Sequence, residues 1–341
     1  MDFLPYDLVD HLAHFLPEAD LQTIAKITGN QPELENWNLV AHEHLEQRFV
    51  LDVNVYIEVC REKHEEKKEE EEERAKRIKN WWRSRARGRR KEENKMPKIR
   101  FFIEKWLPGG GTEWWDFKNR RYASLRCVRV HVQADFEELP CNVNLYRATN
   151  LESVLRIISL PVDRSAIPEG FLFVHLHQLD DPEMSVASKM LHAVQKTFAE
   201  VNIHITRSLN SGVEDPTIED FLYDCFNEGV FLEEMDVYCC DIRKRKVIGA
   251  IASLFGKKRT RPLKVIISEF GSHEIERFIE SWVKSEGHNG EKEVIWKESD
   301  RSWEQLRRKY RLRANRLTLP HPTKRSSLHI SPTGIRSETH I

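Results

Sequence analysis

The stretch FLEEMDVYCC (residues 231–240) is one of five short apolar runs that recur in the second half of this 341-residue chain. Its apolar and polar residues alternate, and a period of two is typical of a β-strand with one buried face. Successive runs begin about 28–34 residues apart, which predicts a repeating unit. The residues at which they begin are Leu172, Val201, Met235, Leu263 and Glu293.

Amphipathic helices are expected between these strands, because apolar residues there recur every three or four positions. Three such stripes run from Ile218 to Phe226, from Val247 to Phe255 and from Ile275 to Val283. A crossover helix between two parallel strands is the simplest connection. We therefore expect an α/β or α+β fold in which residues 151–300 form an irregular strand–helix body, with a doubly wound α/β sheet as the alternative.

The frame of the quoted stretch resembles a leucine-rich repeat. Its L-xx-L-x-L-xx-C positions are occupied by Leu232, Met235, Val237 and Cys240. The runs that begin at Leu172 and Val201 follow the frame in part, and the last two runs depart from it. The body is therefore expected to be leucine-rich-repeat-like, and such bodies bind partner proteins on their strand face.

The outward face of the expected sheet is the candidate substrate-binding surface. Alternate residues of a strand point to opposite faces, so the residues between the apolar positions are expected to face outward. The candidates on this face are His175, His177, Asn202, His204, Asp236, Tyr238, Lys264 and Ser268. At each single position a solvated sheet face without a ligand is the alternative.

Residues 1–50 predict three short helices with more apolar surface than so small a unit can bury. Pro5 and Pro17 are placed to start the first two helices. The third helix is expected to extend to Phe49. Part of the apolar surface is therefore expected either to contact another protein or to cap the rest of the chain.

The segments LPYDLVDHLAHFLPEADLQTIAKIT (residues 4–28) and NWNLVA (residues 36–41) resemble an F-box of the nematode type. The resemblance implies a non-catalytic substrate-recognition subunit of an SCF-type E3 ubiquitin ligase. Such a subunit contacts the ligase adaptor and, through it, the cullin and RING subunits, and presents an unknown protein substrate. The residues implied to bind the adaptor are Leu4, Pro5, Leu8, Val9, Leu12, Phe15, Leu16, Leu21, Ile24, Ile27 and Trp37. A degenerate box or a scaffold outside any ligase is the alternative.

Residues 51–98 are expected to form a charged helical, coiled-coil-like or disordered insert, because most of the segment has no apolar stripe. Within it, the arginines and tryptophans of WWRSRARGRRK (residues 81–91) could contact nucleic acid or act as a nuclear import signal. Nearby glutamates can neutralise these arginines. Nucleic acid is therefore kept as an alternative partner and not as the expected one.

Two further segments complete the expected organisation. Residues 99–150 read as a strand-rich connecting segment with a hairpin turn at residues 108–111, since no Gly-Lys-Ser/Thr follows to make a phosphate loop. Residues 301–341 begin with a basic helical pattern. The Ser, Thr and Pro content that follows predicts a largely disordered basic tail.

Composition predicts an intracellular protein of the cytoplasm or nucleus. The start of the chain has no basic leader before its apolar residues, and no apolar run is long enough to span a membrane. The six cysteines form no CxxC pair and are expected to be reduced. His175, His177 and His204 lack a carboxylate or cysteine at a ligand spacing, and no catalytic motif occurs, so no metal, cofactor or catalytic residue is expected.

Overall fold

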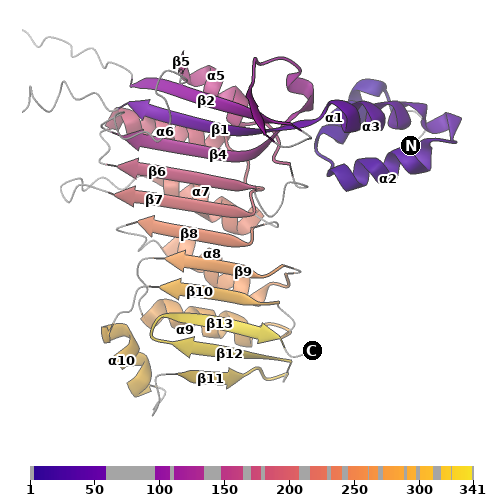
Figure 1. Ribbon diagram of the computed structural model, residues 1–341. Coiled ribbons are helices and arrows are strands. Elements are labelled where there is room, and N and C mark those ends of the chain that lie inside the picture. Colours follow the sequence, from indigo (N-terminus) through magenta and orange to yellow (C-terminus); the bar gives the residue numbers. More distant parts are fainter. Residues whose placement is uncertain are drawn as a thin grey trace, which may run out of the picture.

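Three short helices, a long mixed sheet and a row of helices along that sheet make up the chain in the computed structural model (Figure 1). The structure describes residues 4–58, 97–107, 111–133, 147–163, 170–177, 181–206, 216–228, 232–239, 245–259, 261–267, 272–287, 290–296, 300–309, 316–323 and 325–339. Within these ranges the chain has nine α-helices and thirteen strands, and the fold is mixed α/β.

The N-terminal unit consists of α1 (Tyr6–His14), α2 (Glu18–Thr28), the 3-10 turn η1 (Pro32–Leu34) and α3 (Glu35–Gln47). Pro5 and Pro17 occupy the N-cap positions of α1 and α2, where a missing N–H group costs no helical hydrogen bond. The three helices enclose a small core of their own, formed by Val9, Ala13, Leu21, Ala25, Val40 and Ala41.

One sheet runs through the rest of the chain in the order β11-β12-β13-β10-β9-β8-β7-β6-β4-β1-β2-β3, with β5 paired to β2. Its central strands, from β1 to β10 in this order, are parallel, and the strands at both ends are antiparallel. The first strands are β1 (Phe49–Glu58), β2 (Lys98–Trp106), β3 (Thr112–Trp114), β4 (Ala123–Gln133) and β5 (Arg147–Thr149). The later strands are β6 (Phe171–His177), β7 (Glu200–Thr206), β8 (Glu234–Cys239), β9 (Leu263–Ile267), β10 (Lys292–Trp296), β11 (Leu317–Pro320), β12 (Ser326–Ser331) and β13 (Gly334–Thr339).

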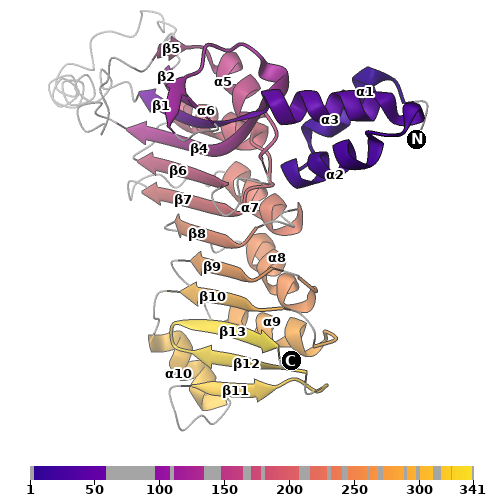
Figure 2. The same ribbon diagram turned by 45° about the vertical axis from the view of Figure 1, so that its right-hand side comes forward.

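The helices that connect the parallel strands cover one face of the sheet and leave the other face open (Figures 1 and 2). They are α5 (Leu151–Ile158), α6 (Asp181–Ala193), α7 (Pro216–Glu228), α8 (Arg245–Gly256) and α9 (Ser272–Val283); α10 (Asp300–Lys309) follows β10 and leads to the antiparallel β11. A doubly wound sheet carries helices on both faces, so this alternative does not describe the arrangement of the described residues. The five strands and three helices expected from the sequence periodicity are confirmed.

The alternation expected along β6–β10 is also confirmed. On the helix-covered face, Val174, Ile203, Val237, Val265 and Val294 are each at most 1% exposed and belong to one continuous core. The residues between them, such as Asn202 and Asp236, are only partly buried. Apart from Lys292 at the start of β10, the polar side chains described on these strands therefore lie on the open face of the sheet.

Residues 49–58 differ from the expectation. The sequence interpretation ended the third helix at Phe49 and began a charged insert at Leu51, but these residues form β1, which pairs with both β2 and β4. Leu51, Val53, Val55 and Ile57 alternate and are all buried, so their period of two is a strand signal. The charged run that follows, residues 61–96, lies outside the described residues. It includes the arginine-rich segment 81–91.

The tail also differs from the expected disorder. After α10, β11, β12 and β13 extend the sheet in antiparallel pairing beside β10. Leu328, Ile330 and Ile335 are at most 2% exposed, and this burial holds the segment in the sheet despite its Ser, Thr and Pro content. At the other end β2 and β3 form the expected hairpin, and the strands of residues 99–150 belong to the same sheet as the body.

Candidate functional site

An exposed apolar stripe runs along α1. Leu8 and Leu12 lie one helical turn apart and Phe15 is the C-cap residue, and these side chains are 43%, 41% and 44% exposed. Val9 and Ala13, on the inner face of the same helix, are buried in the three-helix core. Helical spacing thus divides the apolar residues of α1 between an inner and an outer face.

The remaining residues implied to bind the adaptor are distributed over the same unit. Leu21 joins Val9 in the core, and Leu4, Leu16, Ile24 and Trp37 are partly buried against that core. Pro5 is exposed, and Ile27 on α2 is 58% exposed. The structure therefore assigns Val9 and Leu21 to internal packing and leaves Leu8, Leu12, Phe15 and Ile27 accessible.

Leu39 on α3 was missed by the sequence interpretation and is 49% exposed. Its position between Asn38 and the buried Val40 places it outside the inner stripe of α3. An apolar residue one position away from the buried stripe of a helix is expected to face outward, and this pattern would have identified Leu39 as exposed.

A polar junction ties the three helices to the sheet. Arg121, just before β4, donates from Nε to Oδ1 of Asp10 at 2.8 Å and lies 3.4 Å from the Glu43 carboxylate. His44 hydrogen-bonds to the same Asp10 oxygen at 2.9 Å, and the Tyr122 hydroxyl donates to Glu43 at 3.2 Å. Burial by itself raises the pKa of Asp10, but the hydrogen bonds from Arg121 and His44 outweigh it and lower the pKa.

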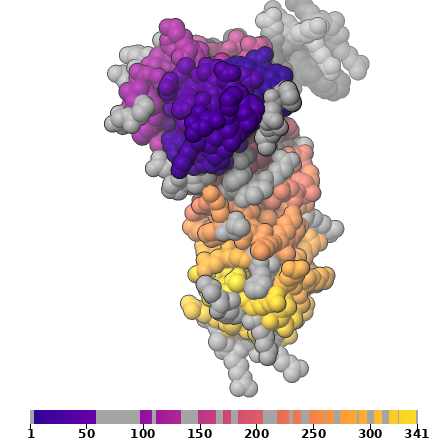
Figure 3. All heavy atoms as spheres, turned by 90° about the vertical axis from the view of Figure 1, so that its right-hand side faces the viewer, coloured from indigo at the N-terminus to yellow at the C-terminus, as the bar shows by residue number. Residues whose placement is uncertain are grey.

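Arg48 and His14 reinforce this junction where α3 leads into β1. The Arg48 guanidinium donates to the carbonyl oxygens of Leu16 and Ala13 at 2.6 and 2.8 Å, and so covers carbonyl groups at the end of α1. His14 Nε2 lies 3.1 Å from the carbonyl oxygen of Ala123 at the start of β4. The helices are therefore anchored at the start of β1 and β4, on the side of the sheet from which the parallel strands begin. Figure 3 views the molecule from that side, with the indigo N-terminal residues in front of the magenta part of the chain.

A ladder of aromatic and histidine rings crosses the open face of the sheet. Tyr56, His131, His175, His204 and Tyr238 occupy the same register position on five adjacent strands. Their ring centroids are separated in turn by 4.9, 6.5, 6.3 and 6.0 Å. Tyr56 is buried, whereas Tyr238 is 49% exposed. The ladder therefore becomes accessible toward β8.

Phe173 supports this ladder from the next level of β6, with ring centroids 5.4 Å from His131 and 5.8 Å from His204. Burial lowers the pKa of His131, and together with smaller contributions from the neighbouring His175 and Arg129 it brings the pKa to about 4. His131 is therefore a neutral ring at physiological pH and acts as a packing group.

A charged level lies nearer the start of the strands. Glu200, Glu234, Lys264, Glu293 and Arg336 are register neighbours on β7, β8, β9, β10 and β13. Lys264 Nζ lies 2.8 Å from Glu234 Oε1. This pairing raises the pKa of Lys264, so Lys264 is charged and neutralises one of the carboxylates.

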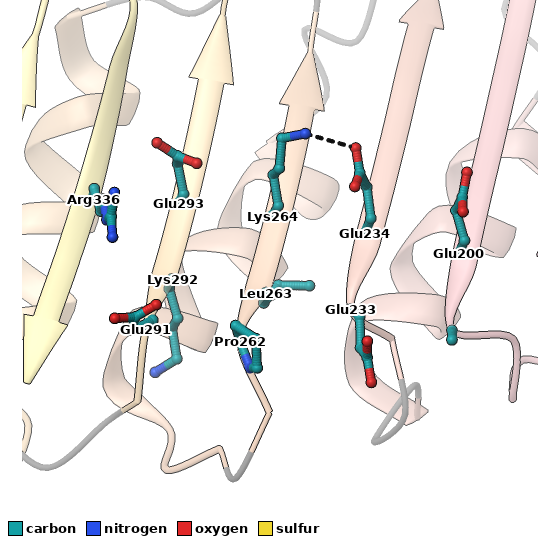
Figure 4. A pocket seen from close by; sticks show the side chains of 11 residues that line it. Glu200, Glu233, Glu234, Pro262, Leu263, Lys264, Glu291, Lys292, Glu293 and Arg336 are labelled. Carbon is teal, nitrogen blue, oxygen red and sulfur yellow. Dashed lines mark hydrogen bonds and ion pairs between the residues drawn. The ribbon is translucent and has the colours of Figure 1, made fainter. Parts of the chain in front are cut away.

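These side chains line a cavity of about 430 Å³ at the beginning of β7–β10. Figure 4 shows Glu200, Glu234 and Glu293 with Lys264 between the last two, and Glu233 and Glu291 at the strand starts. The volume falls in the range of ligand pockets. Its lining contains five carboxylates and three cationic side chains, the latter being Lys264, Lys292 and Arg336.

The expected substrate-binding residues divide into two groups. His175, Asn202, His204, Asp236, Tyr238 and Lys264 lie on the open face, as the alternation predicted. The side chain of His177 and residue Ser268 lie outside the described residues. The sequence interpretation missed Tyr56 and His131, because β1 was not recognised and β4 was not included in the body, although the alternation in VRVHV (residues 128–132) marks His131 as outward-facing.

The described side chains contain no group of three His, Cys, Asp or Glu residues placed to hold a metal ion. Cys127 and Cys225 are buried thiols. In the part of the chain that the structure describes, no helix combines the length and apolar character needed to cross a bilayer. No family model, curated protein or solved structure matches the chain.

Proposed function

We propose that this chain is the substrate-recognition subunit of an SCF-type E3 ubiquitin ligase, with the α1 stripe as the adaptor-docking surface. The observation that carries the proposal is the exposure of Leu8, Leu12 and Phe15 on one helix. A helical cap of the body would cover such a stripe, whereas the hydrogen bonds that join the helices to the start of the sheet use Arg121, Tyr122 and His14 and leave the stripe exposed.

The energetics favour a partner at this surface. Each stripe residue is already more than half covered, so burying the rest contributes about 1 kcal/mol per side chain. For the three stripe residues together this amounts to about 3 kcal/mol. That contribution is large enough for an interface core when charged residues surround it.

The body would hold the substrate, and the chemistry would belong to other subunits of the ligase. A receptor of this kind accelerates ubiquitin transfer by keeping its target close to the loaded enzyme. The polar junction supports this role because it fixes the docking helices relative to the open face. A rigid connection sets the direction in which a bound substrate is presented.

The test is adaptor binding by the full chain with and without the stripe. In the stripe variant Leu8→Asp and Leu12→Asp are combined; in the control variant Val283→Asp changes an equally exposed apolar residue on α9. We expect the adaptor to co-purify with the wild-type chain and the control, and binding by the stripe variant to fall at least 100-fold. The expected loss follows from two buried carboxylates and the lost apolar contacts.

Folding is monitored in all three proteins by circular dichroism and thermal melting. Because Leu8 and Leu12 are exposed, the stripe variant should melt within a few degrees of the wild type. The proposal is wrong if the folded wild-type chain does not bind the adaptor, or if the folded stripe variant binds it as tightly as the control does.

A further inference from the structure

The cavity on the open face has an excess of negative charge that the described residues around it do not balance. Of its five carboxylates, Glu234 pairs with Lys264, and Glu233 lies 2.6 Å from Arg261. Glu291 and Glu293 form no hydrogen bond or ion pair through their side chains with any described residue. Glu200 accepts a hydrogen bond only from the neutral amide of Asn202 within the same ranges.

The cationic lining residues do not offset this excess. Arg336 is paired with Glu338 on its own strand at 3.3 Å. Lys292 points to the helix-covered side, is 1% exposed and donates to the carbonyl oxygen of Lys257. Burial and, to a smaller extent, the neighbouring Arg259 lower the pKa of Lys292 to about 7, so this amine carries only part of a charge at physiological pH.

Along β8, further acidic side chains lead from the cavity to Tyr238, the exposed end of the ring ladder. Glu234, Asp236 and Tyr238 alternate on the open face, so neighbouring side chains stand about 6.6 Å apart along the strand. Asp236 lies 3.8 Å from His204, and Tyr238 is the most exposed ring of the ladder. Carboxylates in line with an accessible aromatic ring match the two ways in which proteins hold arginine and lysine side chains.

The spacing of Glu234, Asp236 and Tyr238 along β8 favours a ligand with an extended backbone. An extended peptide places alternate side chains on one face with the same spacing of about 6.6 Å. The side chains at three alternate positions of that peptide (i, i+2 and i+4) would therefore reach Glu234, Asp236 and Tyr238. A nucleic-acid backbone carries negative charge and would be repelled by the same surface.

We propose that the acidic strip, defined as Glu200, Glu234, Asp236 and Glu293 together with the Tyr238 ring, binds an extended segment of a partner protein that carries arginine or lysine at alternate positions. The inference rests on the proposed function in one respect, since it identifies that partner with the substrate of the receptor. It narrows the substrate class to proteins with an exposed basic segment.

The experiment measures binding of a fluorescent peptide with the sequence (Arg-Ser)4-Arg to the full chain by fluorescence polarisation. A (Glu-Ser)4-Glu peptide and a single-stranded dT oligonucleotide of similar length serve as competing probes. The strip variant combines Glu234→Gln, Asp236→Asn and Glu293→Gln. In the control variant Glu280→Gln removes one exposed carboxylate from α9 on the other side of the sheet.

We expect the basic peptide to bind the wild type and the control, and to bind the strip variant at least tenfold more weakly. Tyr238→Ala alone should weaken binding by about threefold to tenfold, because it removes the cation–π contact and no charge. Adaptor binding by the strip variant should be unchanged. A failure of peptide binding with normal adaptor binding therefore rejects this inference and leaves the proposed function standing.

Three results would overturn the inference. The first is equal binding of the acidic peptide or the oligonucleotide to the wild-type chain. The second is basic-peptide binding that the strip variant retains. The third is binding of the basic peptide only after residues 81–91 are deleted. That result would mean that the ligand of the strip is the chain's own arginine-rich segment.

Discussion

Replacing Lys292 with methionine should stabilise the protein near neutral pH, although it deletes a hydrogen bond. Lys292 is 1% exposed on β10, and its amine contacts the Lys257 carbonyl. Its pKa of about 7 in the folded chain compares with 10.5 for an ordinary lysine. Between these two values the unfolded chain binds a proton that the folded chain does not, so stability rises with pH over this interval.

The magnitude follows from the same difference. At pH 7 the buried amine costs the folded state about 4 kcal/mol relative to pH values above 10.5. The methionine variant avoids this cost but leaves the Lys257 carbonyl without its donor, at about 1–2 kcal/mol. The variant should therefore be about 2–3 kcal/mol more stable than the wild type at pH 7. The advantage should shrink as pH rises and reverse as pH approaches 10.5.

Urea denaturation followed by tryptophan fluorescence at pH 7, 8, 9 and 10 measures this difference. Lys264→Met is the matched control, because Lys264 is the register neighbour of Glu293 on β9 and its pKa is raised by Glu234. The control should show no advantage at pH 7. A Lys292→Met variant that is less stable at pH 7, or whose difference from wild type is the same at every pH, would refute the reasoning.

Two further predictions concern the ring ladder and the junction. His131→Phe keeps a ring beside Tyr56 but cannot bind a proton. The free energy of unfolding of the wild type should fall by up to about 3 kcal/mol between pH 6.5 and 4, since only the unfolded chain protonates this histidine. The melting temperature of the variant should therefore fall less than that of the wild type over the same pH range. An equal fall in both proteins would contradict this. Arg121→Met removes the donor to Asp10 and should weaken the junction by about 1–3 kcal/mol. Amide hydrogen exchange should then accelerate in α1–α3 while β6–β8 stay protected, and uniform acceleration would show that the junction is not a separate unit.

Local periodicity was sufficient to predict the central part of the fold. The strands around Val174, Ile203 and Val237 alternate strictly because one face is covered by helices, and the helix stripes have the matching period. At β1 the same signal was present, but the charged run directly after it dominated the interpretation. The tail strands depend on pairing with β10, a long-range contact that composition does not encode.

The candidate surfaces were predictable in the same uneven way. His175, His204 and Tyr238 followed from alternation once their strands were recognised, whereas Tyr56 and His131 required β1 and β4 to be placed beside β6. The cavity could not be predicted, because its lining comes from several strands and depends on their register. Exposure of Leu8 also depended on knowing which residues of α1 the other two helices cover.

The open face and the helix-covered face of the sheet use different residues of the same strands. Exchanging Asn202, Asp236 or Lys264 alters what the surface attracts without altering a single core contact of Ile203 or Val237. The sheet can therefore acquire new binding preferences through a few substitutions while its folding stability is preserved.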